Sequence, residues 1–213
     1  MKKFLSLAAL LLLAFAGSAQ AATIEVILGN TSVDKTYGVG GSIPTPNIDL
    51  STYGGLVLTN SVIVNPASSL AGQYAQPTGP IYQNNYLSVF GGGNTIFTLA
   101  PNQSSFGFTW GTIDTYNALL LTDSRGVVYT ITGAEVLSNI VGSINGTTQT
   151  DINFLSPLAR IISAQLISTQ NSFEAANFSQ LVGSAVPLPA ALPLFGMGLL
   201  GLAALRRRQA AKA

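Results

Sequence analysis

The sequence predicts an antiparallel all-β domain, and three observations carry this prediction. Short apolar stretches recur between clusters of Gly, Asn, Pro and Ser, which is typical of strands separated by turns. Phe106, Phe108 and Trp110 alternate with Gly107 and Thr109, so a strand would place all three rings on one face. Residues 122–126 carry an Asp early and a Gly at the end, which suits a hairpin turn that ends with positive φ.

The first half of this domain contains five predicted strands. Residues 24–28 form the first strand, and a polar loop containing Pro44 and Pro46 follows it. The next predicted strands are 56–58 and 62–64, on either side of the polar residues 59–61. Residues 86–90 and 95–99 are two further strands, and the glycine-rich residues 91–94 predict a turn between them.

The second half begins with the aromatic strand around Phe108. The predicted strands 116–121 and 127–132 form a hairpin, and the strands 160–168 and 173–178 come later in the chain. Residues 134–140 are compatible with a short helix or a strand, and the strand is favoured.

The C-terminal residues 186–213 differ from the rest of the chain. Residues 186–205 carry no charge, and the cluster Arg206-Arg207-Arg208 follows them. A helix of 20 residues is about 30 Å long at about 1.5 Å per residue, which is enough to cross the hydrocarbon core of a bilayer. The sequence therefore predicts a transmembrane helix whose basic end stays on the cytoplasmic side.

The N-terminal residues 1–21 have the layout of a secretory signal peptide. Lys2 and Lys3 precede an apolar stretch at 4–16, which is followed by an Ala-x-Ala site at Ala19 and Ala21. We expect cleavage after Ala21 or Ala22. The exported domain is then residues 22–184, which is long enough for one domain with a hydrophobic core.

The composition of the exported domain excludes several functions. It holds three basic residues (Lys35, Arg125 and Arg160) against eight acidic ones, so its net charge is −5. Nucleic acid is not expected as a partner, because no basic patch can neutralise phosphates. The chain has no Cys and no His, which removes disulfides, thiol chemistry and the usual base of hydrolytic triads. We expect no cofactor.

The C-terminal pattern resembles a known sorting signal. A short proline motif, one apolar helix and an arginine cluster together resemble the PEP-CTERM signal of Gram-negative bacteria. The motif Val186-Pro187-Leu188-Pro189-Ala190 matches its VPLPA variant, although Leu188 stands where the usual motif has Glu. The resemblance implies transient anchoring in the inner membrane, cleavage by an exosortase, and a final place on the cell surface or in the extracellular matrix. An ordinary membrane anchor explains the helix and the arginines but leaves the motif unexplained.

A second resemblance covers the middle of the domain. The segment 106–117 is similar to the Phe-Gly-Phe-x-Trp-Gly-Ser-x-Asp-Ser-Tyr-Asn segment of many PEP-CTERM surface proteins, and residues 173–177 match a later Phe-Glu-x-x-Asn strand of the same proteins. The resemblance implies a β-sandwich, which we expect to be jelly-roll-like, and a surface location. It implies no activity.

Two sets of candidate site residues remain. Trp110 and Tyr116 could stack on a sugar ring, but the alternation around Trp110 favours a core position. Asp114, Asn117 and Asp123 offer oxygen ligands for calcium, and Asx turns explain Asp114 and Asn117 equally well. We therefore expect a surface or matrix component without catalytic activity. The alternative is a carbohydrate-binding module for the bacterium's own exopolysaccharide, and an enzyme acting on extracellular polymer is the third reading.

Overall fold

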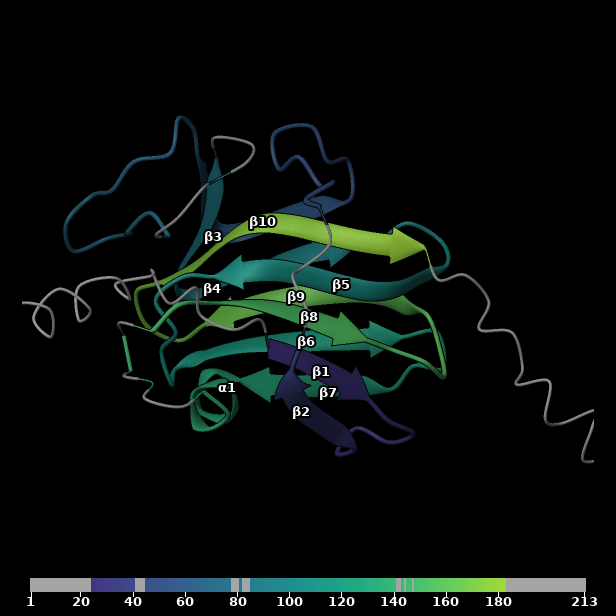
Figure 1. Cartoon of the computed structure of the whole chain (residues 1–213). Coiled ribbons are helices and arrows are strands. Elements are labelled where there is room, and N and C mark those ends of the chain that lie inside the picture. The colour runs from purple at the N-terminus through teal and green to yellow at the C-terminus, as the bar shows by residue number, and fades with distance from the viewer. Residues whose placement is uncertain are drawn as a thin grey trace, which may run out of the picture. The chain divides into compact units, whose positions relative to one another are not determined.

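The computed structural model describes residues 24–40, 45–77, 81, 85–140, 143, 145–146 and 148–182. These residues form one curled, ten-stranded sheet and a short helix (Figure 1). The elements are β1 (Ile24–Leu28), β2 (Lys35–Val39), β3 (Leu56–Val64), β4 (Tyr86–Thr98), β5 (Gln103–Trp110), β6 (Asn117–Asp123), β7 (Val128–Thr132), α1 (Gly133–Ser138), β8 (Thr150–Leu155), β9 (Ile161–Ser168) and β10 (Phe173–Val182). The prediction of an all-β domain is confirmed.

The sheet is mixed, whereas the sequence predicted an antiparallel one. Its strand order is β2-β1-β8-β5-β10-β4-β9-β6-β7, and β3 pairs with β4 off this path. The β1–β8 pair is parallel, with Ile24 opposite Ile152 and Val26 opposite Phe154. Parallel neighbours need a long connection between them, and here most of the domain lies between β1 and β8. Nothing in either strand's own sequence indicates that pairing.

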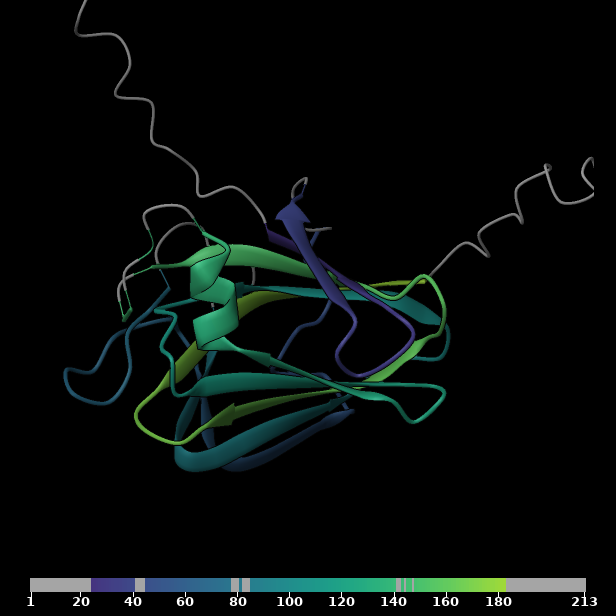
Figure 2. The ribbon, with the colours of Figure 1, turned by 90° about the horizontal axis from the view of Figure 1, so that it is seen from below.

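The predicted turn at residues 91–94 is wrong, because β4 continues through it. The first part of β4 pairs with β10, with Val89 opposite Phe173, and the last part pairs with β9, with Gly93 opposite Ser168. Gly92 has a φ of 76°, and a Cβ at Gly93 would collide with the carbonyl oxygen of Asn60. The glycines therefore allow one strand to bend and change partners, which gives the sheet its curl (Figure 2).

Strand β3 is likewise continuous where the sequence predicted two strands. A register shift between Thr59 and Ser61 accommodates Asn60, whose φ is 47°. Asn is one of the few residues besides Gly that tolerates this conformation, so the polar interruption is a bulge within one strand.

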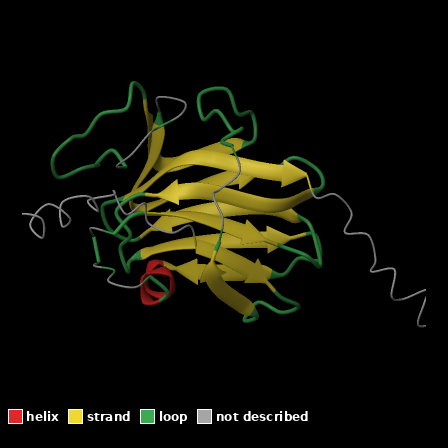
Figure 3. Ribbon diagram, viewed as in Figure 1, coloured by secondary structure: helices red, strands yellow, loops and turns green. Residues whose placement is uncertain are grey.

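The predicted strand at residues 134–140 is also wrong, because Gly133–Ser138 forms the helix α1, drawn in red in Figure 3. Thr132 caps this helix: its hydroxyl oxygen accepts from the backbone N–H of Glu135, and the Glu135 carboxylate accepts from the backbone N–H of Thr132. Such a reciprocal cap favours a helical turn over strand continuation.

The strands β1, β5, β6, β7, β9 and β10 lie close to their predicted positions, whereas β2 and β8 were not predicted. The apolar faces of the strands form the core. The rings of Phe106, Phe108 and Trp110 are fully buried, as their alternation indicated. Phe97 from β4 and Phe178 from β10 pack on them, with 4.7 Å between their own ring centroids. The hairpin loop at residues 122–126 ends with Gly126 at a φ of 81°, which confirms the predicted turn.

Candidate functional site

Trp110 is inaccessible as a stacking surface for a sugar. Its ring packs in parallel on Phe173, with 4.4 Å between the centroids and 11° between the planes. Both rings are fully buried. The indole N–H has no hydrogen-bond partner among the described residues. The ring therefore contributes through packing.

Tyr116 and Asp114 form a polar contact at the start of β6. The Tyr116 hydroxyl lies 2.8 Å from Asp114 Oδ2 and 2.7 Å from the backbone oxygen of Asn171. The Tyr116 hydroxyl has one proton for these two acceptors, so it donates fully to only one of them at a time. Burial raises the pKa of Asp114, and the hydrogen bond from Tyr116 lowers it by less. Burial also raises the pKa of Tyr116, and the hydrogen bond to Asp114 and the negative charge of Asp114 raise it further.

Asn117 has both ends of its side-chain amide engaged. Its Nδ2 donates to the backbone oxygen of Ser172 at 3.1 Å, and its Oδ1 accepts from the Ser168 hydroxyl at 2.7 Å. The side chain is buried. Asn117 therefore joins the start of β6 to the loop that connects β9 and β10, and its oxygen is occupied.

Asp123 is fully buried at the other end of β6, where it meets Arg125. Asp123 Oδ2 accepts from Arg125 Nη2 at 2.6 Å and from Nε at 2.9 Å, and Oδ1 accepts from the backbone N–H groups of Arg125 and Val127. Burial by itself raises the pKa of Asp123, but the hydrogen bonds from Arg125 and Val127 outweigh it and lower the pKa.

The three calcium candidates are therefore not brought together. Asn117 and Asp123 stand at opposite ends of a seven-residue strand, about 20 Å apart at about 3.4 Å per residue. Within the described ranges, no three Asp, Glu, His or Cys side chains gather as a metal would require. Asp114 and Asn117 belong to a local turn, in which the Asn117 N–H donates to the Asp114 carbonyl at 3.1 Å.

A buried carboxylate that the sequence did not single out as a site residue is Glu174 on β10. Its oxygens accept from the Thr112 hydroxyl at 2.7 Å, from the backbone N–H of Ala75 at 3.2 Å and from the Ser172 hydroxyl. The side chain is almost fully buried. With three donors and almost no exposure to solvent, Glu174 has a structural role. It connects the β3–β4 loop, through Ala75, and the β5–β6 loop, through Thr112, to β10.

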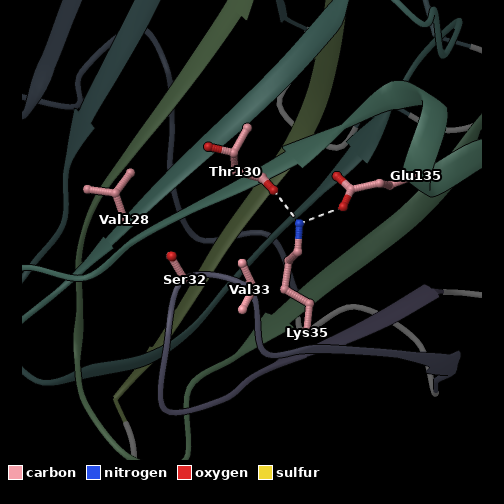
Figure 4. A pocket seen from close by; sticks show the side chains of 6 residues that line it. All are labelled: Ser32, Val33, Lys35, Val128, Thr130 and Glu135. Atoms are coloured by element: carbon pink, nitrogen blue, oxygen red, sulfur yellow. Dashed lines mark hydrogen bonds and ion pairs between the residues drawn. The ribbon is translucent and has the colours of Figure 1, made fainter.

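A shallow depression of about 360 Å³ lies between β2, β7 and α1 (Figure 4). Lys35 enters it, and its ammonium group lies 2.6 Å from Glu135 Oε1 and donates to the backbone oxygen of Thr130. Val33 and Val128 line the rest, together with Ser32. Sequence analysis missed this pair; the one available indication is that Lys35 is one of three cations in the domain.

The remaining sequence-predicted site residues lie outside the described part of the chain. They are the sorting motif Val186–Ala190, the cluster Arg206–Arg208, and the signal-peptide residues Ala19 and Ala21. Within the part that is described, no helix has the length and apolar character needed to span a membrane.

The described fold and its polar clusters define an all-β domain in which buried side chains such as Asp123 and Glu174 join strands and loops. Comparison with known proteins assigns the chain to no family, because no family model, no curated protein and no solved structure matches it.

Proposed function

We propose that this chain is an exported, exosortase-processed component of the cell surface or extracellular matrix of a Gram-negative bacterium, without catalytic activity. The observation that carries the proposal is the order of segments in the sequence: a signal peptide, a domain of net charge −5, the motif Val186–Ala190, an apolar run and three arginines. An exosortase that cuts near the motif would release the domain from the transient anchor in the inner membrane.

The boundaries of the fold are compatible with cleavage at both ends. Every described strand lies between Ile24 and Val182, and the compact unit ends at Val182, four residues before Val186. Cutting after Ala21 or near Val186 would therefore remove no described strand. We propose that the mature protein consists essentially of this domain.

The proposed architecture is a jelly-roll-like β-sandwich. The partner change along β4, from β10 at Val89 to β9 at Gly93, supports this, because strands that pass from one sheet to another commonly do so at a bend or bulge. The curl brings one half of the sheet to face the other across the aromatic core (Figure 2).

The site geometry favours a non-catalytic role over the carbohydrate-binding alternative. The large apolar side chains exposed in the described part of the chain are all aliphatic, whereas sugar-binding surfaces use exposed aromatic rings. The buried carboxylates Asp123 and Glu174 are engaged with donors on this chain, which leaves neither free to act as an acid or a base.

Mass spectrometry of the protein from the envelope of its natural host tests the proposal. We expect a mature species that starts near Ala22 and stops near Val186. In a strain that lacks the exosortase, the species should retain the C-terminal residues and fractionate with the inner membrane. Recovery of Arg206–Arg208 on envelope protein from the strain with an active exosortase would falsify the sorting proposal.

A further inference from the structure

The end of the domain at which β10 stops lies at the right in Figure 1 and includes four loops. Val182, the last residue of β10, pairs with Gln103 at the start of β5, so the β4–β5 loop lies beside it. The four loops are residues 99–102, 156–160, 124–127 and 29–34, and they are joined in this order by the hydrogen bonds Ser156–Ser104, Ser124–Arg160 and Arg125–Asn30. We call these loops and the strand residues that adjoin them the β10 end.

Half of the large apolar side chains that are exposed in the described part of the chain lie at the β10 end. Val33 in the β1–β2 loop is 79% exposed, and Leu158 in the β8–β9 loop is 60% exposed. The other three belong to strand residues next to the loops: Val128, Ile162 and Leu181. A single exposed aliphatic side chain is ordinary, but a group of them at one end indicates a contact surface.

The β10 end also has little charge that is not already paired. Two of its cations are held in the ion pairs Arg125–Asp123 and Lys35–Glu135. Arg160 and Asp34 remain, one of each sign, and Arg160 is exposed. At the opposite end, Glu25 and Asp151 are each the second residue of a strand, and neither has an ion pair among the described residues.

The chain leaves the domain at the β10 end and continues to the predicted membrane helix. Val186, where the uncharged run begins, is four residues after Val182, so the two lie at most about 14 Å apart. Strand β10 has ten residues and is about 33 Å long at about 3.3 Å per residue. While the predicted helix spans a bilayer, this short tether keeps the β10 end close to the membrane surface.

We propose that the β10 end rests on the lipid surface of the membrane while the chain is anchored. The exposed aliphatic side chains would enter the headgroup region, where apolar surface is stabilised, and Arg160 would lie near lipid phosphates. Anionic lipids would repel the opposite end through Glu25 and Asp151. The inference rests on the predicted membrane helix, which the sorting proposal shares with an ordinary membrane anchor.

Spin labels on the full chain test the inference, since the natural chain has no Cys. Val33→Cys places a label at the β10 end, and Val39→Cys is the matched control, because Val39 is also 79% exposed and pairs with Ile24 at the opposite end of the β1–β2 hairpin. Leu158→Cys gives a second position at the β10 end. Each variant is prepared from a host without an exosortase and placed in nanodiscs of phosphatidylcholine and phosphatidylglycerol.

The readout is the accessibility of each label to oxygen, which enters the bilayer, divided by its accessibility to a water-soluble nickel chelate. We expect this ratio to be about fivefold higher for Val33→Cys and Leu158→Cys than for Val39→Cys, because apolar side chains at a membrane surface enter the headgroup boundary.

A second substitution checks that the surface itself makes the contact. Adding Leu158→Asp to Val33→Cys should lower the ratio to that of Val39→Cys, because a carboxylate then faces the anionic lipid. Adding Val39→Asp changes the net charge equally at the opposite end and should leave the ratio unchanged. Both positions are exposed, so neither substitution should lower the melting temperature.

Three results would overturn the inference. Equally low ratios at all three labels would show that the domain stands away from the lipid. A high ratio only for Val39→Cys would show that the opposite end faces the membrane. Release of the full chain from membranes by alkaline carbonate would show that no helix anchors it. High ratios at Val33 and Leu158, together with Arg206–Arg208 retained on envelope protein from a host with an active exosortase, would support this inference and reject the sorting proposal.

Discussion

The ammonium group of Lys35 donates a hydrogen bond to the backbone carbonyl of Thr130, which lies on the strand at the opposite end of the sheet. Lys35 begins β2 and Thr130 lies on β7, so one side chain links the two end strands of the curl. The Tyr129 hydroxyl and Arg125 Nη2 add a second link by donating to the backbone oxygen of Gly29, at 2.8 Å and 3.1 Å. The Lys35 link also occupies a backbone oxygen of the edge strand β7 that could otherwise pair with another chain.

The first prediction concerns the Lys35 link. Lys35→Met keeps the apolar stem and removes the charge, so the ion pair with Glu135 and the bond to Thr130 are lost. The Lys35 side chain is 11% exposed and the Glu135 side chain 38% exposed, so we expect a loss of about 1–2 kcal/mol in the free energy of unfolding. Urea denaturation measures it. Arg160→Met removes one exposed cation elsewhere and should change stability by less than about 0.5 kcal/mol; equal losses would contradict the link.

The second prediction concerns acid unfolding through Asp123. Its pKa is lower in the folded state than the ordinary value of 3.8, because donors from Arg125 and Val127 outweigh its burial. The stabilisation is therefore present above pH 3.8 and disappears as the pH falls through the folded pKa. Urea midpoints between pH 5 and pH 2 should fall more steeply for the natural chain than for Asp123→Asn. Arg125→Met should also flatten the curve, and an unchanged slope in both variants would count against this role.

The third prediction concerns Asp114, whose effect has the opposite sign. Burial raises its pKa above 3.8 in the folded state, so the folded protein holds this proton more tightly than the unfolded chain. That stabilisation is complete below the unfolded pKa and is lost as the pH rises through the folded one. Asp114→Asn can still donate to Tyr116 but does not titrate. Its stability relative to the natural chain should therefore increase from pH 4 to pH 7, and parallel curves would refute the raised pKa of Asp114.

The fourth prediction concerns Trp110. Trp110→Ala should cost about 3–5 kcal/mol, as truncations of large buried aromatic side chains do. Trp110→Phe should cost clearly less, because it keeps a ring on Phe173 and no hydrogen bond to a described residue is lost. Thermal melts of both variants give the comparison. If Trp110→Ala instead melted like the natural chain and lost retention on the producer's polysaccharide, Trp110 would be a binding residue.

Much of the strand pattern could be predicted from local sequence. Period-2 alternation located β5 because each inward ring is followed by a small or polar residue. The same alternation is present in β8, where Ile152 and Phe154 alternate with Asp151 and Asn153, and sequence analysis missed it. For residues 134–140 a short helix was considered but the strand was favoured, although Thr132 and Glu135 have the spacing of a capping box that indicates the helix α1.

The candidate site was less predictable, because its contacts are long-range. Asp114, Asn117 and Asp123 are close in sequence and of suitable type for calcium, yet strand β6 separates Asp123 from the other two. Asn117 instead meets Ser168 and Ser172, and Asp123 meets Arg125. Residue type indicates which chemistry is available, and only the packing of distant segments decides which partner occupies each group.

The sequence by itself determined the strand-rich character of the domain, its net charge of −5 and the absence of Cys and His. These follow from composition and from a side-chain period that each strand carries locally. Only the tertiary structure decided that β4 bends at Gly92 and Gly93 to change partners, that β1 runs parallel to β8, and that Lys35 reaches Thr130. Such features depend on which strands meet across long stretches of chain, and that choice is made by burying all the apolar faces in one core at once.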